Sequence, residues 1–243
     1  MLKLIQTEFM KLRRRKFVWL MLSAALFMPL FALSYFQHIG ETGIDSIQFY
    51  KWAAFSYTPW IILPVVLGML CTMLLYDEHQ YDVCKQLWIV PIHPMGYFFS
   101  KFAVVLFYAI LFMCITACAS VLAGSFSGCI VWDGNSALYL LKKCMEIGVL
   151  TAFAMIPVLA VAASQKGYIL PVCVTLIYTF LGFILLMVNM YLHPLSSTTA
   201  IVMGDVPGVV LPQELNHIAA LFCIGIWGVV STTAANISLS RRR

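Results

Sequence analysis

Six apolar runs, each about as long as a membrane-spanning helix, most constrain how this chain can fold. A helix of about 20 residues is about 30 Å long, which matches the hydrocarbon core of a bilayer. Hydrophobic residues make up 62% of the chain and charged residues only 10%, against about 25% charged residues in soluble domains. We therefore predict an all-α polytopic membrane protein with six transmembrane helices. Their predicted ranges are 17–36, 57–76, 99–123, 139–163, 169–190 and 218–237.

The basic residues predict how these helices are oriented. With six spans, twelve of the fifteen Lys and Arg residues fall on one side of the membrane and three on the other. Because Lys and Arg accumulate in cytoplasmic segments, we predict that both termini are cytoplasmic. The same placement accounts for the net charge of +5 without a nucleic-acid partner.

Residues 1–16 predict an amphipathic helix that precedes the first span. Leu2, Ile5, Phe9 and Leu12 recur at helical spacing and share one face. Such a basic helix lies in the membrane interface, with its cations near anionic lipid headgroups. The simpler alternative is that this segment only fixes the orientation of the first span. The candidate membrane-surface residues are Lys11, Arg13, Arg14, Arg15 and Lys16.

A polar loop at 77–98 joins the second and third spans on the predicted cytoplasmic side. It begins as a short amphipathic helix, whose apolar residues recur three or four apart. Two prolines then end the helix, and the carboxylates at its start are expected to cap it. Exposed apolar side chains need a partner surface or the bilayer interface, although an ordinary inner loop is the alternative. The candidate docking residues are Asp77, Glu78, Asp82, Val83, Leu87, Trp88 and Val90.

Two features stand out on the predicted outer side. The segment 191–217 is apolar, but its runs are too short and too broken to span, which predicts a re-entrant or interfacial segment. Glu146 is the one carboxylate placed clearly within a predicted span, where a charge costs at least about 2.5–3.5 kcal/mol. Either it faces a translocation pathway or a subunit interface, or Lys142 or Lys143 neutralises it near the surface. Asn189 is a second such candidate, with helix packing as its alternative. We treat 17–243 as a single membrane domain.

The motifs of catalysis are missing from the sequence. It has no GxxxxGK[ST] phosphate loop, no HExxH and no GxSxG. Its eight cysteines form no CxxC pair and fall mostly in apolar runs, so we predict neither a metal site nor a cofactor. His93 and His193 each precede a proline near a membrane boundary and are interpreted as structural. The chain is therefore expected not to be an enzyme, and another polypeptide would supply any energy.

Three features together carry a resemblance to a known family. They are the start TEFMKLRRRKFVW, the stretch YDEHQYDVCKQLWIVPIHPMGYFFSK between the second and third spans, and a semi-apolar segment before the sixth span. In these features the chain resembles the ABC-2 type permeases of bacterial ATP-driven exporters. More narrowly, it is similar to the permease subunits of lantibiotic or bacitracin immunity transporters. The Ser-Pro-Ile-Ser-like turn usual in that loop is Val-Pro-Ile-His here, at residues 90–93.

The resemblance implies a role for the polar loop. Residues from about Asp77 to Ile92 would form the coupling helix that contacts the ATPase. The implied partners are a separate ABC ATPase dimer that binds ATP and Mg²⁺, a second permease, identical or paralogous, and an amphipathic antimicrobial peptide as substrate. The implied location is the cell membrane of a bacterium. The alternative from another class is a six-span scaffold or sensor partner without a transport role, which would not co-purify with an ATPase.

Overall fold

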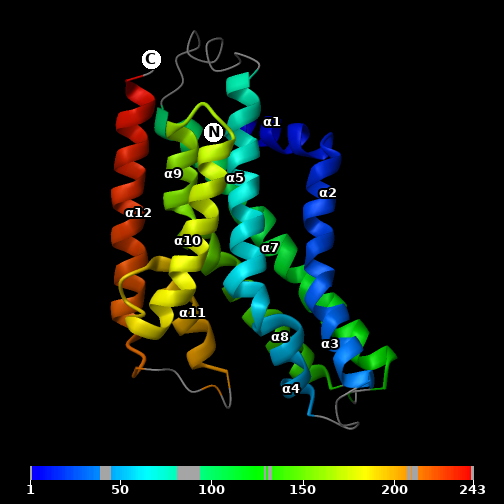
Figure 1. Cartoon of the computed structure of the whole chain (residues 1–243). Helices are drawn as coiled ribbons and strands as arrows, with labels where there is room; N and C mark the ends of the chain where they lie inside the picture. The colour runs from blue at the N-terminus through cyan, green and yellow to red at the C-terminus, as the bar shows by residue number, and fades with distance from the viewer. Residues whose placement is uncertain are drawn as a thin grey trace.

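The computed structural model describes residues 2–38, 45–80, 94–128, 130, 133–206, 209 and 213–241. The described part is helical and contains no strand, and six of its helical stretches are long and apolar enough to cross a membrane. The prediction of an all-α polytopic membrane protein with six spans is confirmed. The six stretches, which lie side by side in Figure 1, are Lys16–His38, Ser46–Glu78, Pro94–Phe126, Gly134–Ser164, Ile169–Val188 and His217–Ser240.

Several spans are built from more than one helix. The first consists of α2 (Lys16–Ser23), η1 (Ala24–Leu26) and α3 (Phe27–His38). The second consists of α4 (Ser46–Tyr50), η2 (Lys51–Phe55), η3 (Thr58–Ile62) and α5 (Leu63–Gln80), in which η2 and η3 are π-helical. The remaining elements are α1 (Leu2–Arg13), α7 (Pro94–Phe126), α8 (Gly134–Ala154), α9 (Ile156–Ser164), α10 (Ile169–Val188), α11 (Pro194–Gly204) and α12 (His217–Ser240).

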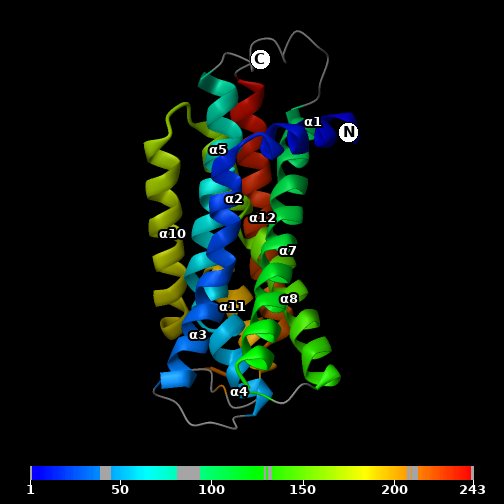
Figure 2. The same cartoon turned by 90° about the vertical axis from the view of Figure 1, so that its right-hand side faces the viewer.

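The helix α1 lies across one end of the bundle instead of along it (Figures 1 and 2). The helix α1 and the end of α12 are both at this end, as an even number of spans requires. We call it the basic end, because the basic run of residues 11–16 lies there, and we call the other one the opposite end. The predicted helix before the first span is thus present. Its contact with lipid headgroups stays a prediction.

The second span starts earlier than the sequence predicts. We expected it to begin at residue 57, but α4 and η2 extend the helical stretch back to Ser46. Phe49, Ala53 and Phe55 are buried in this extension, so it belongs to the bundle and not to a solvated loop. The sequence hides this, because charged and polar residues interrupt the apolar pattern there.

Proline and a partner hydroxyl together explain the break in the first span. Pro29 has no N–H to donate to the carbonyl of Ala25, four residues earlier. The hydroxyl of Thr116 on α7 is shared between that carbonyl, at 3.3 Å, and the carbonyl of Phe112 on its own helix, at 3.1 Å. An unsatisfied carbonyl in the hydrocarbon region would cost several kcal/mol. The break is therefore stabilised by the neighbouring helix.

Two glycines allow close helix contacts. A Cβ placed on Gly68 of α5 would lie 2.0 Å from Cγ2 of Thr175 on α10. A Cβ on Gly148 of α8 would lie 3.1 Å from the backbone oxygen of Ala109 on α7. Small residues at such points let helix backbones approach closely, which drives helix association in membranes.

We expect Gly68→Ala to lower the stability of the protein by roughly 1–3 kcal/mol, because the new methyl group overlaps the Thr175 side chain. Adding Thr175→Ala should restore most of the loss. The measurement is the melting temperature of the detergent-solubilised protein. Samples are heated to a series of temperatures, and size-exclusion chromatography then measures the folded protein that remains.

Gly225→Ala is the matched control, because a Cβ at Gly225 meets no atom within 4 Å. If Gly68→Ala melted at the same temperature as Gly225→Ala, the close contact between α5 and α10 would be wrong.

Candidate functional site

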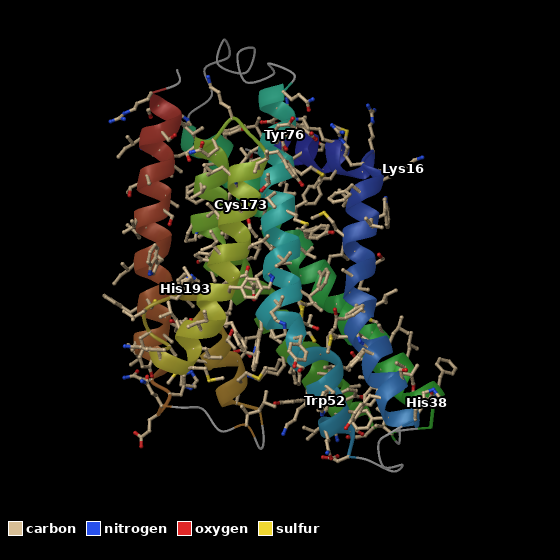
Figure 3. The ribbon with its side chains drawn as sticks, viewed as in Figure 1. Lys16, His38, Trp52, Tyr76, Cys173 and His193 are labelled. Carbon is tan, nitrogen blue, oxygen red and sulfur yellow. The ribbon has the colours of Figure 1, made fainter. Side chains whose placement is uncertain are left out.

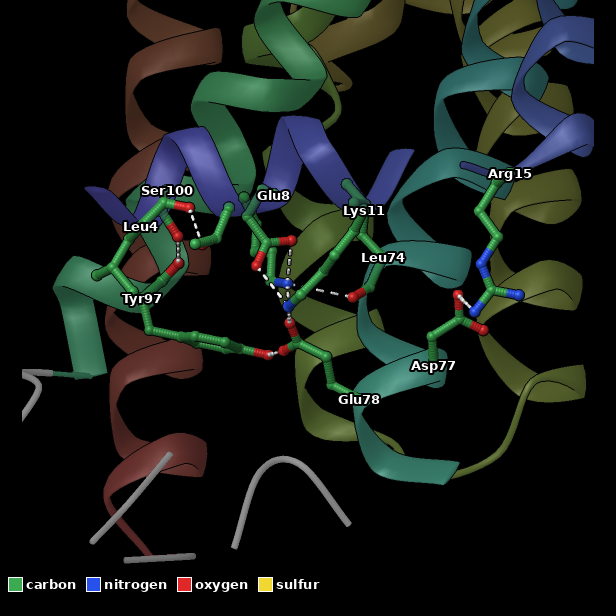
Figure 4. Close-up of polar contacts among 11 residues, drawn as sticks. Leu4, Glu8, Lys11, Arg15, Leu74, Asp77, Glu78, Tyr97 and Ser100 are labelled. Carbon is green, nitrogen blue, oxygen red and sulfur yellow. Dashed lines mark hydrogen bonds and ion pairs between the residues drawn. The ribbon is translucent and has the colours of Figure 1, made fainter. Parts of the chain in front are cut away.

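Four charged side chains from three helices meet at the basic end (Figure 4). The Nζ atom of Lys101 on α7 lies 2.5 Å from Oε1 of Glu78 on α5 and 2.6 Å from Oε2 of Glu8 on α1. The Nζ atom of Lys11 on α1 lies 2.6 Å from Oε1 of Glu78 and 3.0 Å from Oε1 of Glu8. We call these four residues the charge cluster. Two cations and two anions make it neutral as a whole.

Three of the four residues of the charge cluster are buried, and their charged atoms are hydrogen-bonded. Lys101 is 1% exposed, and Glu8 and Glu78 are each 4% exposed. The third acceptor of the Lys101 ammonium is the carbonyl of Leu74, at 3.3 Å. The Tyr97 hydroxyl donates to the other oxygen of Glu78 at 2.5 Å. A buried network in which every group is paired is rigid and specifies one geometry.

Helical spacing explains how each helix presents its side chains. Glu8 and Lys11 are three residues apart on α1 and therefore share a face. Glu78 follows Leu74 by four residues on α5, and Lys101 follows Tyr97 by four on α7. Each helix thus contributes one turn to the cluster.

Electrostatics favour the charged form of Lys11, although its side chain is 47% exposed. Burial lowers the pKa of Lys11, but hydrogen bonds to Glu78 and Glu8 outweigh burial, and the pKa lies above its ordinary value of 10.5. A second ion pair lies beside the cluster, where Arg15 binds Asp77 at 2.8 Å. The segment before α2 is therefore also bound to α5.

The structure places only part of the predicted docking set. Asp77 and Glu78 lie inside α5, and their carboxylates bind cations from the N-terminal segment and α7. Their capping of a following helix stays a prediction. The other candidate docking residues lie outside the described residues: Asp82, Val83, Leu87, Trp88 and Val90.

The predicted membrane-surface cations divide into two groups. Lys11 and Arg15 bind carboxylates. Arg13, Arg14 and Lys16 are exposed, and no ion pair joins them to another described residue. The interfacial role predicted from the sequence remains open for these three.

Sequence reasoning missed Glu8, Tyr97 and Lys101 as site residues. Each is a polar residue beside a span, on the same predicted side as Glu78. Isolated charges of opposite sign at neighbouring span ends were a signal that could have paired them, since such charges are costly unless they are partnered.

At the opposite end, Lys143 binds Glu146 at 2.9 Å, which agrees with the alternative in which Lys142 or Lys143 neutralises this carboxylate. Lys143 also binds Asp205, which caps α11, at 2.7 Å. Asn189 ends α10 and accepts a hydrogen bond from the backbone N–H of Tyr191 at 3.0 Å. None of the described contacts joins Glu146 to Asn189, and a pathway or interface role for either stays a prediction.

His193 has the structural role that the sequence predicts, whereas His93 lies outside the described residues. His193 is the N-terminal cap of α11, where its Nδ1 accepts a hydrogen bond from the backbone N–H of Leu195 at 3.3 Å. Residues 194–203 are all buried, so part of the predicted semi-apolar segment folds into the bundle as a short helix. Its re-entrant position in the bilayer stays a prediction.

The fold and the position of the charge cluster define a multi-pass membrane protein whose helix ends are joined at the basic end. A family model described as "ABC-2 family transporter protein" matches residues 4–182, which include the whole charge cluster. The chain therefore belongs to the ABC-2 family of transporter proteins. In this family the membrane component is not itself catalytic and generally works with an ABC ATPase. No curated protein matches the chain.

We expect Lys101→Met to destabilise the protein by about 3–5 kcal/mol, because it leaves two buried carboxylates with one half-exposed cation. Adding Glu8→Gln restores neutrality and should recover part of the loss. The readout is thermal unfolding in detergent.

Lys142→Met is the control for Lys101→Met, because Lys142 is exposed on α8. Equal unfolding temperatures for the two single variants would show that the cluster is not needed for stability.

We expect the protein to become less stable as the pH is lowered from 6.5 to 4, because His193 titrates in this range. Burial lowers its pKa from 6.5 to about 4, so the unfolded chain binds more protons than the folded one between these values. The loss from pH 6.5 to pH 4 should be roughly 2–3 kcal/mol. His193→Asn keeps a capping side chain that does not titrate, and it should flatten this part of the profile. A profile unchanged by the substitution would contradict the assignment.

Proposed function

We propose that this protein is the membrane-spanning permease of an ATP-driven exporter, and that the charge cluster couples ATPase movement to its helices. One observation carries the proposal. The cluster joins the last turn of α5 and the first turns of α7, which are the two helix ends that flank residues 81–93. These residues contain the loop that the resemblance assigns to ATPase contact.

Chain connectivity supports this role. The loop leaves α5 after Gln80 and returns at Pro94, so Glu78 and Lys101 lie within two helical turns of its two ends. A partner that pushes the loop must push both helix ends. Because Lys101 and Glu78 are also bound to α1, the three helices are expected to move as one unit.

The chemistry of the cluster suits a relay. A buried ion pair adds little net stability, but breaking it by removing one partner is strongly destabilising. The helix ends are therefore fixed in one relative geometry. An apolar contact of the same size would allow sliding, whereas charge-assisted hydrogen bonds impose both distance and direction.

We further propose the particular transporter type. The partners are a separate ABC ATPase dimer that binds ATP and Mg²⁺, and a second permease. The substrate is an amphipathic peptide of the lantibiotic or bacitracin type, and export would give immunity or antibiotic resistance. Two points support this proposal. One is the resemblance. The other is that the charged residues of the described spans lie near the two ends of the bundle, so the described spans carry no line of charges across the membrane of the kind that a strongly polar substrate would need. In a bacterial cell membrane, the basic end would lie on the cytoplasmic side.

The experiment is purification of the tagged chain from its native membrane in mild detergent, followed by mass spectrometry. An ABC ATPase at about one copy per permease would support the proposal, and a second six-span protein would indicate a heterodimer. Recovery with a histidine kinase, or with no partner, would overturn it in favour of a sensor or scaffold.

We expect Glu78→Gln to lower the ATPase rate of the assembled transporter severalfold while the ATPase stays bound, because the relay loses one charge. Leu87→Asp should instead release the ATPase, because it places a charge on the predicted docking face. ATPase assays and co-purification measure the two effects separately.

Asp133→Asn is the matched control for Glu78→Gln. Asp133 is exposed at the opposite end and caps α8 by accepting from the backbone N–H groups of Asn135 and Ser136, a role that Asn also fills well. If both variants kept the full ATPase rate, the coupling role of the cluster would be wrong.

A further inference from the structure

A cavity of about 190 Å³ lies at the opposite end, far from the charge cluster. One wall is the broken start of the second span, including Lys51, Trp52 and Trp60. The other wall comes from the end of α11 and the residues after it, including Met203 and Val206. Figure 3 shows Trp52 at this end, away from Lys16 and Tyr76. Nothing in the proposed coupling mechanism uses this cavity.

Lys51 is the one charged side chain among the described residues that line the cavity. No ion pair joins it to any carboxylate in the described ranges. Asp205, beside the α11 wall, is bound to Lys143 instead. A partly buried ammonium without a counter-ion is unfavourable, and it attracts an anion to the cavity.

The start of the second span holds other groups without partners. Four buried side-chain polar atoms in the described chain have no hydrogen-bond partner, and one of them is Nε1 of Trp60, a residue that lines the cavity. A second is Oγ1 of Thr58, which lies in the same stretch of the chain but not in the cavity lining. Between the two π-helical turns, Ser56 has φ −74° and ψ −110°, outside the helical region. Unpaired buried polar groups need an explanation, and π-helical turns are frequent at functional sites.

The size and the walls of the cavity restrict what fits. Pockets for drug-sized ligands usually measure about 300–1,000 Å³, so this one holds a headgroup and not a whole amphiphile. Trp52, which lines the cavity, is 37% exposed, and aromatic side chains of this kind favour the interface of a bilayer. A ligand with a small anionic head and an apolar tail that stays in the bilayer meets both conditions.

We propose that this cavity binds the phosphate headgroup of an anionic phospholipid, with Lys51 as the counter-ion. The Ser56 hydroxyl supplies a further donor at the cavity wall, and the aromatic rings and the apolar end of α11 contact the glycerol and the first part of the acyl chains. The site is distinct from the basic end, where Arg13, Arg14 and Lys16 are exposed.

The test is native mass spectrometry of the full chain, purified in detergent and titrated with phosphatidylglycerol or with phosphatidylcholine of the same acyl chains. The wild-type protein should bind one phosphatidylglycerol molecule in preference to phosphatidylcholine. Lys51→Gln should weaken this binding about tenfold, the loss expected for one charge-assisted hydrogen bond, and leave phosphatidylcholine binding unchanged.

Lys142→Gln is the matched control, because it removes an exposed lysine from α8 without touching the cavity. It should bind phosphatidylglycerol like the wild-type protein. Ser56→Phe, which fills the cavity, should also abolish the preference. Unchanged binding in both Lys51→Gln and Ser56→Phe would overturn the proposal. Displacement of the lipid by millimolar glycerol phosphate would show that the site takes free phosphate, which would overturn it as a lipid site.

Discussion

The structure depends most on the ion pairs that Lys101 makes inside the protein. An ammonium that is 1% exposed is tolerated only because Glu8, Glu78 and a backbone carbonyl surround it. Among the described contacts of Lys101, Glu8 is the one partner from outside the spans, so this ion pair holds α1 across the end of the bundle. The pair with Glu78 holds the neighbouring ends of α5 and α7 at the same level. The arrangement of the basic end follows from one buried charge.

Elsewhere in the bundle, hydroxyl groups of neighbouring helices donate hydrogen bonds to backbone carbonyls at helix breaks. The hydroxyl of Thr116 satisfies the carbonyl of Ala25 near Pro29, and the hydroxyl of Tyr178 donates to the carbonyl of Ala154 at 2.6 Å, where α8 gives way to α9. In both cases the donor belongs to a different helix from the acceptor. Because backbone groups in a bilayer have no water to bond, each helix break also holds a neighbouring helix in position.

The sequence predicted what depends on local pattern. Six apolar runs gave six spans, the spacing of Lys143 and Glu146 gave an ion pair, and a proline after His193 indicated a structural histidine. It did not predict contacts between distant segments. Glu8 is 70 residues from Glu78 and 93 from Lys101, and no periodicity joins positions so far apart. The early start of the second span was missed because charged and polar residues interrupt its apolar pattern, so that its burial is visible only from its contacts with other helices.

The helix α5 connects the main features of the molecule. Glu78 lies in the charge cluster, and Gly68, ten residues or about 15 Å away along the axis, touches Thr175 on α10. Beyond Leu63 the regular helix gives way to the π-helical turns and to the break at Ser56. Between the cluster and the α10 contact the helix is unbroken, so under the proposed coupling role a push at the basic end would reach α10 through a rigid element. Movement at the opposite end would instead be taken up at Ser56, which lines the cavity, so that under the two proposals occupancy of the cavity would change how stiffly the second span responds.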